Sequence, residues 1–280
     1  MAALHLVATP IGNLEDVTLR ALRVLREAEL VLAEDTRHTR MLLDRHGITA
    51  KAVSLHGHNE QKRSQLALDV LARGGDVALV SDAGTPLVSD PGERLVRAVL
   101  AAGHAVSAVP GASAVLAALV ASGLPTEAFS FVGFAPRRAG ERKDLFASLR
   151  DRADTLVLFE SPRRVAATLR ELADALGTRR ACVARELTKL HEELARGTLD
   201  ELALRFSGGA RGEVTLVIEG APARSAAPAS ELVDAAIRAR AAAGGSASEI
   251  ARDVACATGV PRSAIYGRVV ALASSASNSA

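Results

Sequence analysis

The sequence predicts an α/β protein with two α/β domains and a small helical element near its C-terminus. Three observations lead to this fold class. Short apolar runs alternate with amphipathic helical patterns along most of the 280 residues. Hydrophobic residues make up 49% of the chain, enough for a sizeable core without disulfides or metals. Aromatic residues make up only 2%, so Ala, Val and Leu must build that core, as suits helices packed on buried strands.

The first part of the chain repeats strand–helix units. We expect strands at 4–8, 30–34, 51–56, 77–80 and 105–109, and helices at 17–28, 39–47, 61–73 and 112–122. A further helix follows residue 92, because the apolar residues between Leu95 and Leu100 lie on one stripe. Such repeats predict a parallel sheet covered by helices on both faces. Gly123 and Pro125 then break the rhythm, so the first domain is assigned to residues 1–123.

The second part of the chain contains another set of apolar runs. Strands are expected at 129–134, 155–160, 181–185 and 213–220, with helices starting near Arg142 and Pro162. We assign this second α/β domain to residues 124–220 and the Pro/Ala/Ser-rich segment 221–229 to a linker. Helical patterns at 231–243 and 246–257, and a third after them, predict a helix-turn-helix-like element over 230–272. The Ser-rich tail, 273–280, is expected to be disordered.

Charge and cysteine content exclude several classes of protein. With 34 basic and 32 acidic residues the net charge is only +2, so any nucleic-acid-binding surface must be local. Cys182 and Cys256 are isolated in the sequence, which argues against a zinc site or a disulfide scaffold. No signal peptide and no apolar run of membrane-spanning length is recognisable, so a soluble cytoplasmic protein is expected.

Three loops with a shared character follow predicted strands of the first domain. They cover 8–13 ("ATPIGN"), 81–92 ("SDAGTPLVSDPG") and 110–114 ("PGASA"). Ligands of open α/β sheets bind beyond the carboxyl ends of the strands, and glycines allow the backbone to approach them closely. The alternative is that these residues only form turns and caps, as we expect for Asp90, an apparent N-cap before Pro91. None of the loops matches the GxGxxG or P-loop pattern.

Taken in order, the motifs of the chain resemble one enzyme family. They are "VATPIGNLEDVTLRAL", "LAEDTRHTRMLL", "LHGHNE", "VSDAGTPLVSDPG", "VPGASA", "FESPRR", "ARELTKLHEE" and "RGEVTLVIEG". This series is similar to the tetrapyrrole methylase superfamily, and within it to the ribosomal RNA small subunit methyltransferase I branch. The resemblance implies S-adenosylmethionine bound in a cleft between two α/β domains. It also implies 2′-O-methylation of a cytidine ribose in the decoding region of small-subunit (16S) ribosomal RNA, in the assembled 30S subunit, by a homodimer.

The resemblance assigns cofactor contacts to the three loops. The residues carried over are Pro10, Asp82, Ala83, Gly84, Thr85, Gly111, Ser113 and Ala114. Small residues allow close backbone contact with the adenosine and amino-acid parts of the donor, and Asp82 can accept from a hydroxyl or an amine. For Asp82 the alternative is a turn-forming role.

Methyl transfer to a ribose also requires help with the proton of the hydroxyl. The donor carries the difficult chemistry, but a neutral hydroxyl is a poor nucleophile, so a base or a charge stabiliser is expected. Asp35 and Glu186 are the base candidates, with Arg37 and Lys189 as their charge partners. The alternative for each is an ion pair or a helix cap.

Local basic clusters are the candidate RNA contacts, because arginine forks suit phosphate oxygens. They comprise Arg137, Arg138, Arg142, Lys143, Arg163 and Arg164; the alternative is an ordinary solvated helix start. The C-terminal element has few basic residues for a member of this branch, which argues against direct RNA binding by that element.

Two other functions stay open at this stage. A methyltransferase acting on a tetrapyrrole would favour an aromatic-lined cleft, yet the chain has six Phe, one Tyr and no Trp. The loop "ATPIGN" is also less glycine-rich than the form associated with tetrapyrrole-modifying members. A non-enzymatic nucleic-acid-binding protein, using the C-terminal helices, is the second alternative.

Overall fold

The computed structural model describes residues 2–57, 59–222, 229–258 and 261–277. It divides into two compact units, an α/β unit over Met1–Ala221 and a helical unit over Pro222–Ala280. The α/β unit holds two sheets, each with five strands among the described residues. Nowhere in the described part of the chain is a helix long and apolar enough to cross a membrane.

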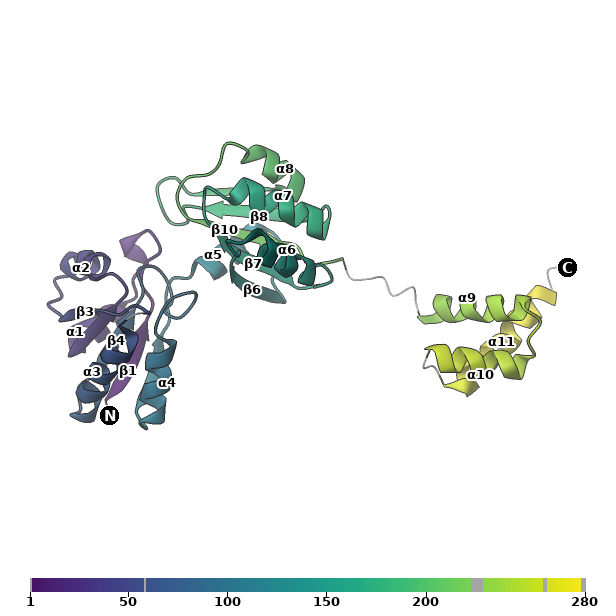
Figure 1. Ribbon diagram of the computed structural model, residues 1–280, viewed down its shortest axis with the longest axis horizontal. Coiled ribbons are helices and arrows are strands. Elements are labelled where there is room, and N and C mark those ends of the chain that lie inside the picture. The colour runs from purple at the N-terminus through teal and green to yellow at the C-terminus, as the bar shows by residue number, and fades with distance from the viewer. Residues whose placement is uncertain (1, 58, 223–228, 259–260, 278–280) are drawn as a thin grey trace. The chain divides into compact units, whose positions relative to one another are not determined.

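The first sheet is parallel throughout, as predicted. Its strands are β1 (Ala3–Val7), β2 (Leu30–Ala33), β3 (Ala52–Ser54), β4 (Val77–Val80) and β5 (Ala105–Val109). They are ordered β3-β2-β4-β1-β5; Figure 1 labels β3, β4 and β1 of this sheet. Because β4 and β2 are fully buried, they read as continuous apolar runs rather than alternating ones.

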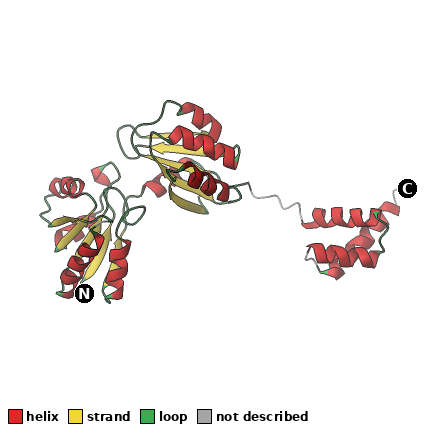
Figure 2. Ribbon diagram, in the orientation of Figure 1, coloured by secondary structure: helices red, strands yellow, loops and turns green. Residues whose placement is uncertain are grey.

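Helices cover both faces of this sheet. One face carries α1 (Leu19–Glu27) and α2 (Thr36–Arg45), and the other carries α3 (Glu60–Ala72) and α4 (Glu93–Ala101) (Figure 2). Leu25 and Leu43 pack on the first face, whereas Leu71 and Leu95 pack on the second. Thr18 caps α1 through its side chain, so the helix begins two residues later than the predicted start at Val17.

The second sheet is mixed. Its strands are β6 (Phe129–Phe134), β7 (Thr155–Glu160), β8 (Arg180–Arg185), β9 (Glu193–Thr198) and β10 (Val214–Ile218), in the order β6-β7-β10-β8-β9. β6 and β7 are parallel, and the other neighbours are antiparallel. One face packs against α6 (Ala139–Ser148), α7 (Val165–Leu176) and α8 (Leu199–Arg205).

The opposite face of the second sheet is covered by α5 (Ala114–Ser122), which the sequence assigned to the first domain. Val115, Ala118 and Leu119 of this helix share a core with Val157 and Val217. The helix therefore begins at the end of a strand of one sheet and packs on the other sheet. Because α5 packs on the second sheet, the expected boundary after residue 123 does not separate the cores of the two domains.

Two elements of the second domain were not predicted. β9 lies at the edge of the sheet, and only Ala195 of its six residues is buried, so it lacks an apolar pattern. Its Arg196 donates instead to the Ser122 carbonyl at the end of α5, at 2.9 Å. The short helix α8 starts with a capping box formed by Thr198 and Glu201. β9 therefore depends on a partner distant in the sequence, whereas the start of α8 is fixed locally.

The helical unit contains α9 (Ala229–Ala242), α10 (Ala247–Thr258) and α11 (Arg262–Ser277), close to the predicted helices. Ile237, Ile250 and Ile265 contribute one residue from each helix to a small common core. The expected linker lies mostly outside the described residues. The expected disordered tail differs from the structure over 273–277, because α11 continues to Ser277 through a run of Ala and Ser residues compatible with helix.

Candidate active site

The loops after β1, β4 and β5 are tied together at the carboxyl edge of the first sheet. Thr9 and Gly84 exchange backbone hydrogen bonds of 2.9 and 3.0 Å. Gly84 has φ +84° and Gly111 lies against Ala8, where an added Cβ would approach the Ala8 Cβ to 3.0 Å. These two glycines are thus required by a turn and by a close backbone approach. The three loops form one surface, as their positions after parallel strands predicted.

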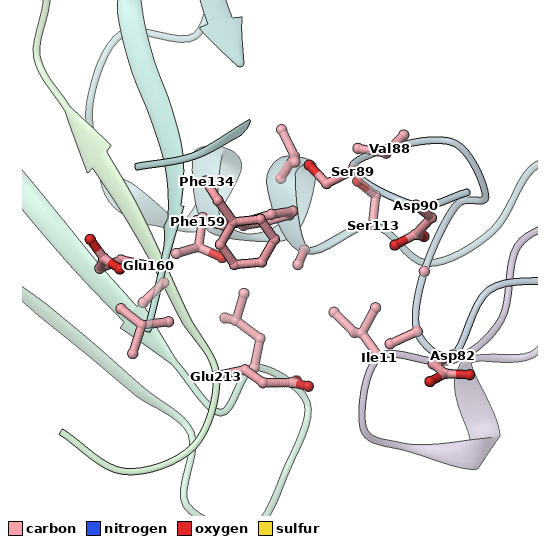
Figure 3. Close-up of a pocket in the computed structure, with 18 of the residues that line it drawn as sticks. Ile11, Asp82, Val88, Ser89, Asp90, Ser113, Phe134, Phe159, Glu160 and Glu213 are labelled. Carbon is pink, nitrogen blue, oxygen red and sulfur yellow. The ribbon is translucent and has the colours of Figure 1, made fainter. Parts of the chain in front are cut away.

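A cavity of about 380 Å³ lies between this surface and the second sheet (Figure 3). Its volume falls within the range of small-molecule sites. The first domain contributes Ile11, Glu34, Asp82–Thr85, Val88–Asp90 and Ser113–Val115. The second contributes Phe134, Phe159–Pro162, Ala184, Leu187 and Gly212–Thr215.

Six of the eight predicted cofactor residues line this cavity: Asp82, Ala83, Gly84, Thr85, Ser113 and Ala114. Ser113 also caps α5, accepting from the Leu116 amide. Pro10 and Gly111 lie beside the cavity without lining it, and Gly111 instead supports the loop after β1. The structure therefore brings the three predicted loops to one cavity and separates lining residues from supporting ones.

The cavity is lined by acidic side chains. Its described lining includes Glu34, Asp82, Asp90, Glu160 and Glu213, and no Lys or Arg. Burial raises the pKa of Glu34, and the Asp82 charge raises it further. Burial, followed by the Glu34 charge, raises the pKa of Asp90 to about 6. Negative charge thus raises the pKa values of Glu34 and Asp90, and the acidic lining favours a cationic ligand.

The prediction that Asp90 is an N-cap was wrong. Helix α4 begins at Glu93, its N-cap is Gly92 at φ 127°, and that position has no side-chain cap. The Glu60 carboxylate of α3 accepts from the amides of Arg94 and Leu95, at 2.9 and 3.3 Å. Because a distant residue satisfies these amides, Asp90 is free to face the cavity, where it lies near Ser113 in Figure 3.

Backbone strain is concentrated beside the cavity. Among the described residues, the non-glycine residues with positive φ are Leu87, Ser89, Glu186 and Thr188. The first two belong to the loop after β4 and the other two to the loop after β8. Such conformations cost free energy and persist where the surroundings enforce them, typically at functional sites.

The candidate base Asp35 acts as a helix cap in the structure. Its carboxylate accepts from the Arg37 amide at 2.8 Å and from the Arg37 guanidinium, and neither residue lines the cavity. Hydrogen bonds from Arg37 lower the pKa of Asp35 to about 2. These contacts correspond to the capping alternative that the sequence left open.

Glu186 and Lys189 form an ion cluster at the border of the cavity. Glu186 Oε1 accepts from Lys189 Nζ at 3.0 Å and from the Glu213 amide at 3.1 Å. The Lys189 ammonium also contacts Glu213 Oε2 at 3.0 Å, and its stem packs on Gly12 of the loop after β1. Hydrogen bonding from Lys189 lowers the pKa of Glu186. Burial lowers the pKa of Lys189, but the hydrogen bonds to both carboxylates outweigh this effect, so the pKa is raised.

The predicted RNA contacts divide into exposed and structural residues. Arg137, Arg138, Lys143 and Arg163 are exposed. Arg142 is only 9% exposed and forms a bidentate pair with Glu171, at 2.5 and 2.6 Å, so its prediction as a surface contact was wrong. Arg164 is engaged by Glu160 at 2.5 Å and by two backbone carbonyls. A cluster of basic residues in the sequence does not show which of their side chains are buried.

Comparison with known proteins identifies the family. A family model described as Tetrapyrrole (Corrin/Porphyrin) Methylases matches residues 3–203. The chain belongs to this tetrapyrrole methylase family. Proteins named ribosomal RNA small subunit methyltransferase I are similar to it over most of its length. The one from Micromonospora olivasterospora is 47% identical over 95% of this chain and 86% of its own. The one from Mesorhizobium japonicum is 45% identical over 96% and 92%.

Solved structures of tetrapyrrole methylases share the fold. Uroporphyrin-III-C-methyltransferase from Thermus thermophilus superposes with a TM-score of 0.57 at 24% identity, covering 78% of this chain and 94% of that one. The methyltransferase CobJ gives a TM-score of 0.60 at 20% identity, covering 79% and 95%. The family model ends at residue 203, before the helical unit, whereas the relatives of higher identity extend through most of the chain.

Sequence reasoning missed several residues that line the cavity. Asp90 was assigned to capping, Glu34 was noted only as a strand end, and Phe134, Phe159 and Glu213 were not singled out. A signal existed for Phe134, since the preceding Gly133 interrupts a strand pattern, as glycines at bulges do. Phe159 and Glu213 lie in the motifs "FESPRR" and "RGEVTLVIEG", but nothing in those motifs distinguished them; Phe159 is half-buried on β7, and Glu213 is exposed just before β10.

Proposed function

We propose that this protein transfers a methyl group from S-adenosylmethionine to the 2′-oxygen of a cytidine ribose in the decoding region of small-subunit ribosomal RNA. The observation that carries the proposal is the identity of 43–47% with small-subunit RNA methyltransferases over more than nine-tenths of the chain, helical unit included. The tetrapyrrole-modifying structures share the fold at 24% identity or less.

The acidic cavity fits a cationic donor. S-adenosylmethionine would supply an activated methyl group on a sulfonium, next to an ammonium group. Glu34, Asp82 and Asp90 offer negative charge to these cations without a competing basic side chain in the described lining. The backbone at Ala83, Gly84 and Ala114 leaves room for close contact. Pro10 and Gly111 would act by holding the loops in place.

The same carboxylates give the nucleophile a proton acceptor. We assign this role first to Asp90, because a base works best when its pKa lies near the working pH. The Lys189 ammonium, held by Glu186 and Glu213, would stabilise negative charge developing on the ribose oxygen. Glu186 and Asp35 rank behind Asp90 as bases, because neither lines the cavity and hydrogen bonds from Lys189 and Arg37 lower their pKa values.

RNA phosphates would stay outside the acidic cavity. Carboxylates repel them, so only a ribose and its base would enter, and the exposed Arg137, Arg138, Lys143 and Arg163 would hold the flanking backbone. Arg142 and Arg164 would support this surface from within. The proposed substrate is the assembled 30S subunit, and the proposed location is the cytoplasm, where such subunits are found.

A homodimer is part of the proposal. Leu116 and Val120 lie one turn apart on α5 and are 51% and 72% exposed, which a second copy would cover. Solution mass measured for the wild type and for Leu116→Glu tests this point. The proposal expects a dimer that the substitution weakens, and a monomeric wild type would contradict it.

Methyl transfer measured with three acceptors tests the function itself. Labelled S-adenosylmethionine is incubated with the protein and with 30S subunits, naked small-subunit RNA or a uroporphyrinogen-type tetrapyrrole. The proposal expects label in RNA and none in the tetrapyrrole. Label in the tetrapyrrole alone would favour the small-molecule alternative. RNA binding without transfer to any acceptor would favour the non-enzymatic one.

A further inference from the structure

The end of β6 carries a bulge that redirects a phenylalanine. Phe131 lies opposite Val157 of β7, but Gly133 lies opposite Leu158, so Val132 is an extra residue in β6. In an unbroken strand Phe131 and Phe134 would face opposite sides of the sheet. The bulge, with Gly133 at φ +80°, puts both on the face that carries Phe159.

Three of the six phenylalanines therefore form one cluster, and two of them, Phe134 and Phe159, line the cavity. The Phe131 and Phe134 rings lie 4.9 and 5.3 Å from the Phe159 ring, measured between centroids. Phe134 lines the cavity next to Phe159, and 58% of it remains exposed (Figure 3). The cavity thus has an aromatic surface beside its acidic one, in a chain with few aromatic residues.

The segment that follows Phe134 is fixed by two structural arginines. Arg142 donates to the carbonyls of Pro136 and Arg137, at 3.0 and 3.1 Å. Arg164 donates to the carbonyls of Pro136 and Ala135, at 3.0 and 2.8 Å. Glu171 and Glu160 neutralise these two guanidinium groups. Four hydrogen bonds therefore hold a short loop that begins beside the exposed ring and ends at the exposed Arg137 and Arg138.

We propose that Phe134 is the platform on which the base of the target nucleotide stacks. The inference rests on the proposed function and names the group that recognises its substrate. A nucleotide that is methylated in a closed site must first leave the base stack of the RNA. An exposed aromatic ring of the protein usually replaces the base on which it was stacked. Arg137 and Arg138 bind the flanking phosphates from the same fixed loop, while the acidic side of the cavity takes the donor. Arg142 and Arg164 are positioning residues.

Substitution of Phe134, compared with Phe129, tests this proposal. Phe129 lies on the same strand, is 41% exposed and does not line the cavity, so Phe129→Ala is the matched control. Phe134→Ala should lower kcat/KM for 30S subunits about 5- to 150-fold, the usual loss for one base-stacking residue. The affinity for S-adenosylmethionine and the melting temperature should stay unchanged, and Phe129→Ala should behave as the wild type.

Phe134→Trp provides an independent readout, because the chain has no tryptophan of its own. It should keep most of the activity, and its fluorescence should be quenched by a cytidine-containing RNA oligonucleotide. Wild-type kcat/KM in Phe134→Ala would overturn the proposal, as would an equal loss in Phe129→Ala or a loss of donor affinity that accounts for the effect. If the wild type binds the donor but methylates no RNA, the proposed function fails. The fluorescence then decides stacking alone: quenching by RNA supports it, and quenching only by a tetrapyrrole overturns it.

Discussion

Asp82 Oδ1 accepts a hydrogen bond of 2.8 Å from the backbone amide of Asp35 and so ties the loop after β4 to the start of α2. The other carboxylate oxygen lies 3.4 Å from Nδ1 of His38. Asp82 also lines the cavity. One side chain therefore serves both the architecture of the loops and the charge of the proposed donor site, and its two roles can be separated by substitution.

Replacement of Asp82 should weaken donor binding. Asp82→Ala removes the charge and the acceptor, and we expect affinity for S-adenosylmethionine to fall about 10- to 100-fold, as for a hydrogen bond to a charged group. Asp82→Asn keeps an acceptor for the Asp35 amide, so it should lose affinity while keeping the wild-type melting temperature. Calorimetric titration measures the affinities, and thermal unfolding measures the melting temperatures. Unchanged affinity in Asp82→Ala would remove this residue from the donor site.

The pH dependence of methyl transfer should reflect Asp90. A base must be ionised, so with a pKa of about 6 the rate should fall as the pH drops through 6. Asp90→Asn should lower kcat by about 100-fold or more and abolish that limb of the profile. Asp44→Asn, at an exposed position on α2, is the control. A variant Asp90→Asn that keeps the wild-type profile would assign the limb to another group.

Asp90 should also make stability depend on pH. Its folded-state pKa is raised from 3.8 to about 6, so ionisation opposes folding. The favourable contribution is complete below pH 3.8 and is lost as the pH rises through 6. Asp90→Asn should therefore increase the free energy of unfolding at pH 8, by less than the full pKa shift implies because solvent screens this half-buried carboxylate, and have little effect near pH 3.5. Denaturant titrations at both values measure this, and equal effects would contradict the shift.

Arg137 and Arg142 should separate RNA binding from folding. Arg142→Ala breaks the pair with Glu171 and two carbonyl contacts, so we expect a loss of about 2–3 kcal/mol in stability. Arg137→Ala should change stability by less than about 0.5 kcal/mol and reduce the salt dependence of RNA binding by about one unit of slope. Chemical unfolding and salt titrations of binding distinguish them. A reversal of the two patterns would invalidate the division into structural and exposed arginines.

The end of β10 offers a test of the fold. A Cβ added at Gly220 would lie 1.9 Å from the Ala153 carbonyl oxygen, and backbone cannot move aside cheaply. Gly220→Ala should therefore destabilise the protein by about 3 kcal/mol or more. Gly208→Ala, where the added atom meets nothing within 4 Å, should change stability by less than about 0.5 kcal/mol. Similar melting temperatures for the two variants would contradict this packing.

The first sheet could be predicted almost strand by strand, because the buried β2 and β4 leave continuous apolar runs and the more exposed β5 still reads as the apolar run "AVSAV". β9 could not be predicted, because only Ala195 of this edge strand is buried and its sequence therefore shows no apolar pattern. The packing of α5 on the second sheet was equally hidden, because the helix follows directly from a strand of the first. Helix periodicity identifies an apolar face but does not say which sheet covers it.

The site was predictable where one loop carries it and not where distant residues cooperate. The loop after β4 was expected to face a ligand because it follows a buried strand, and the resemblance named Asp82–Thr85, which line the cavity. It misassigned Asp90 because the cap of α4 comes from Glu60, more than 30 residues away. It counted Arg142 as a surface contact because the basic cluster hides that this side chain turns towards Glu171. For both Asp90 and Arg142, a contact with a residue distant in the sequence made the prediction wrong.

Nucleoside composition of treated RNA tests the central claim most directly. Small-subunit RNA from 30S subunits lacking the modification is incubated with the protein and S-adenosylmethionine, digested to nucleosides and analysed by mass spectrometry. The proposed function predicts 2′-O-methylcytidine, one per subunit at most, with the wild type, and little or none with Asp82→Ala. Methyl groups on a base, or no methylated nucleoside from a protein that binds the donor, would contradict it.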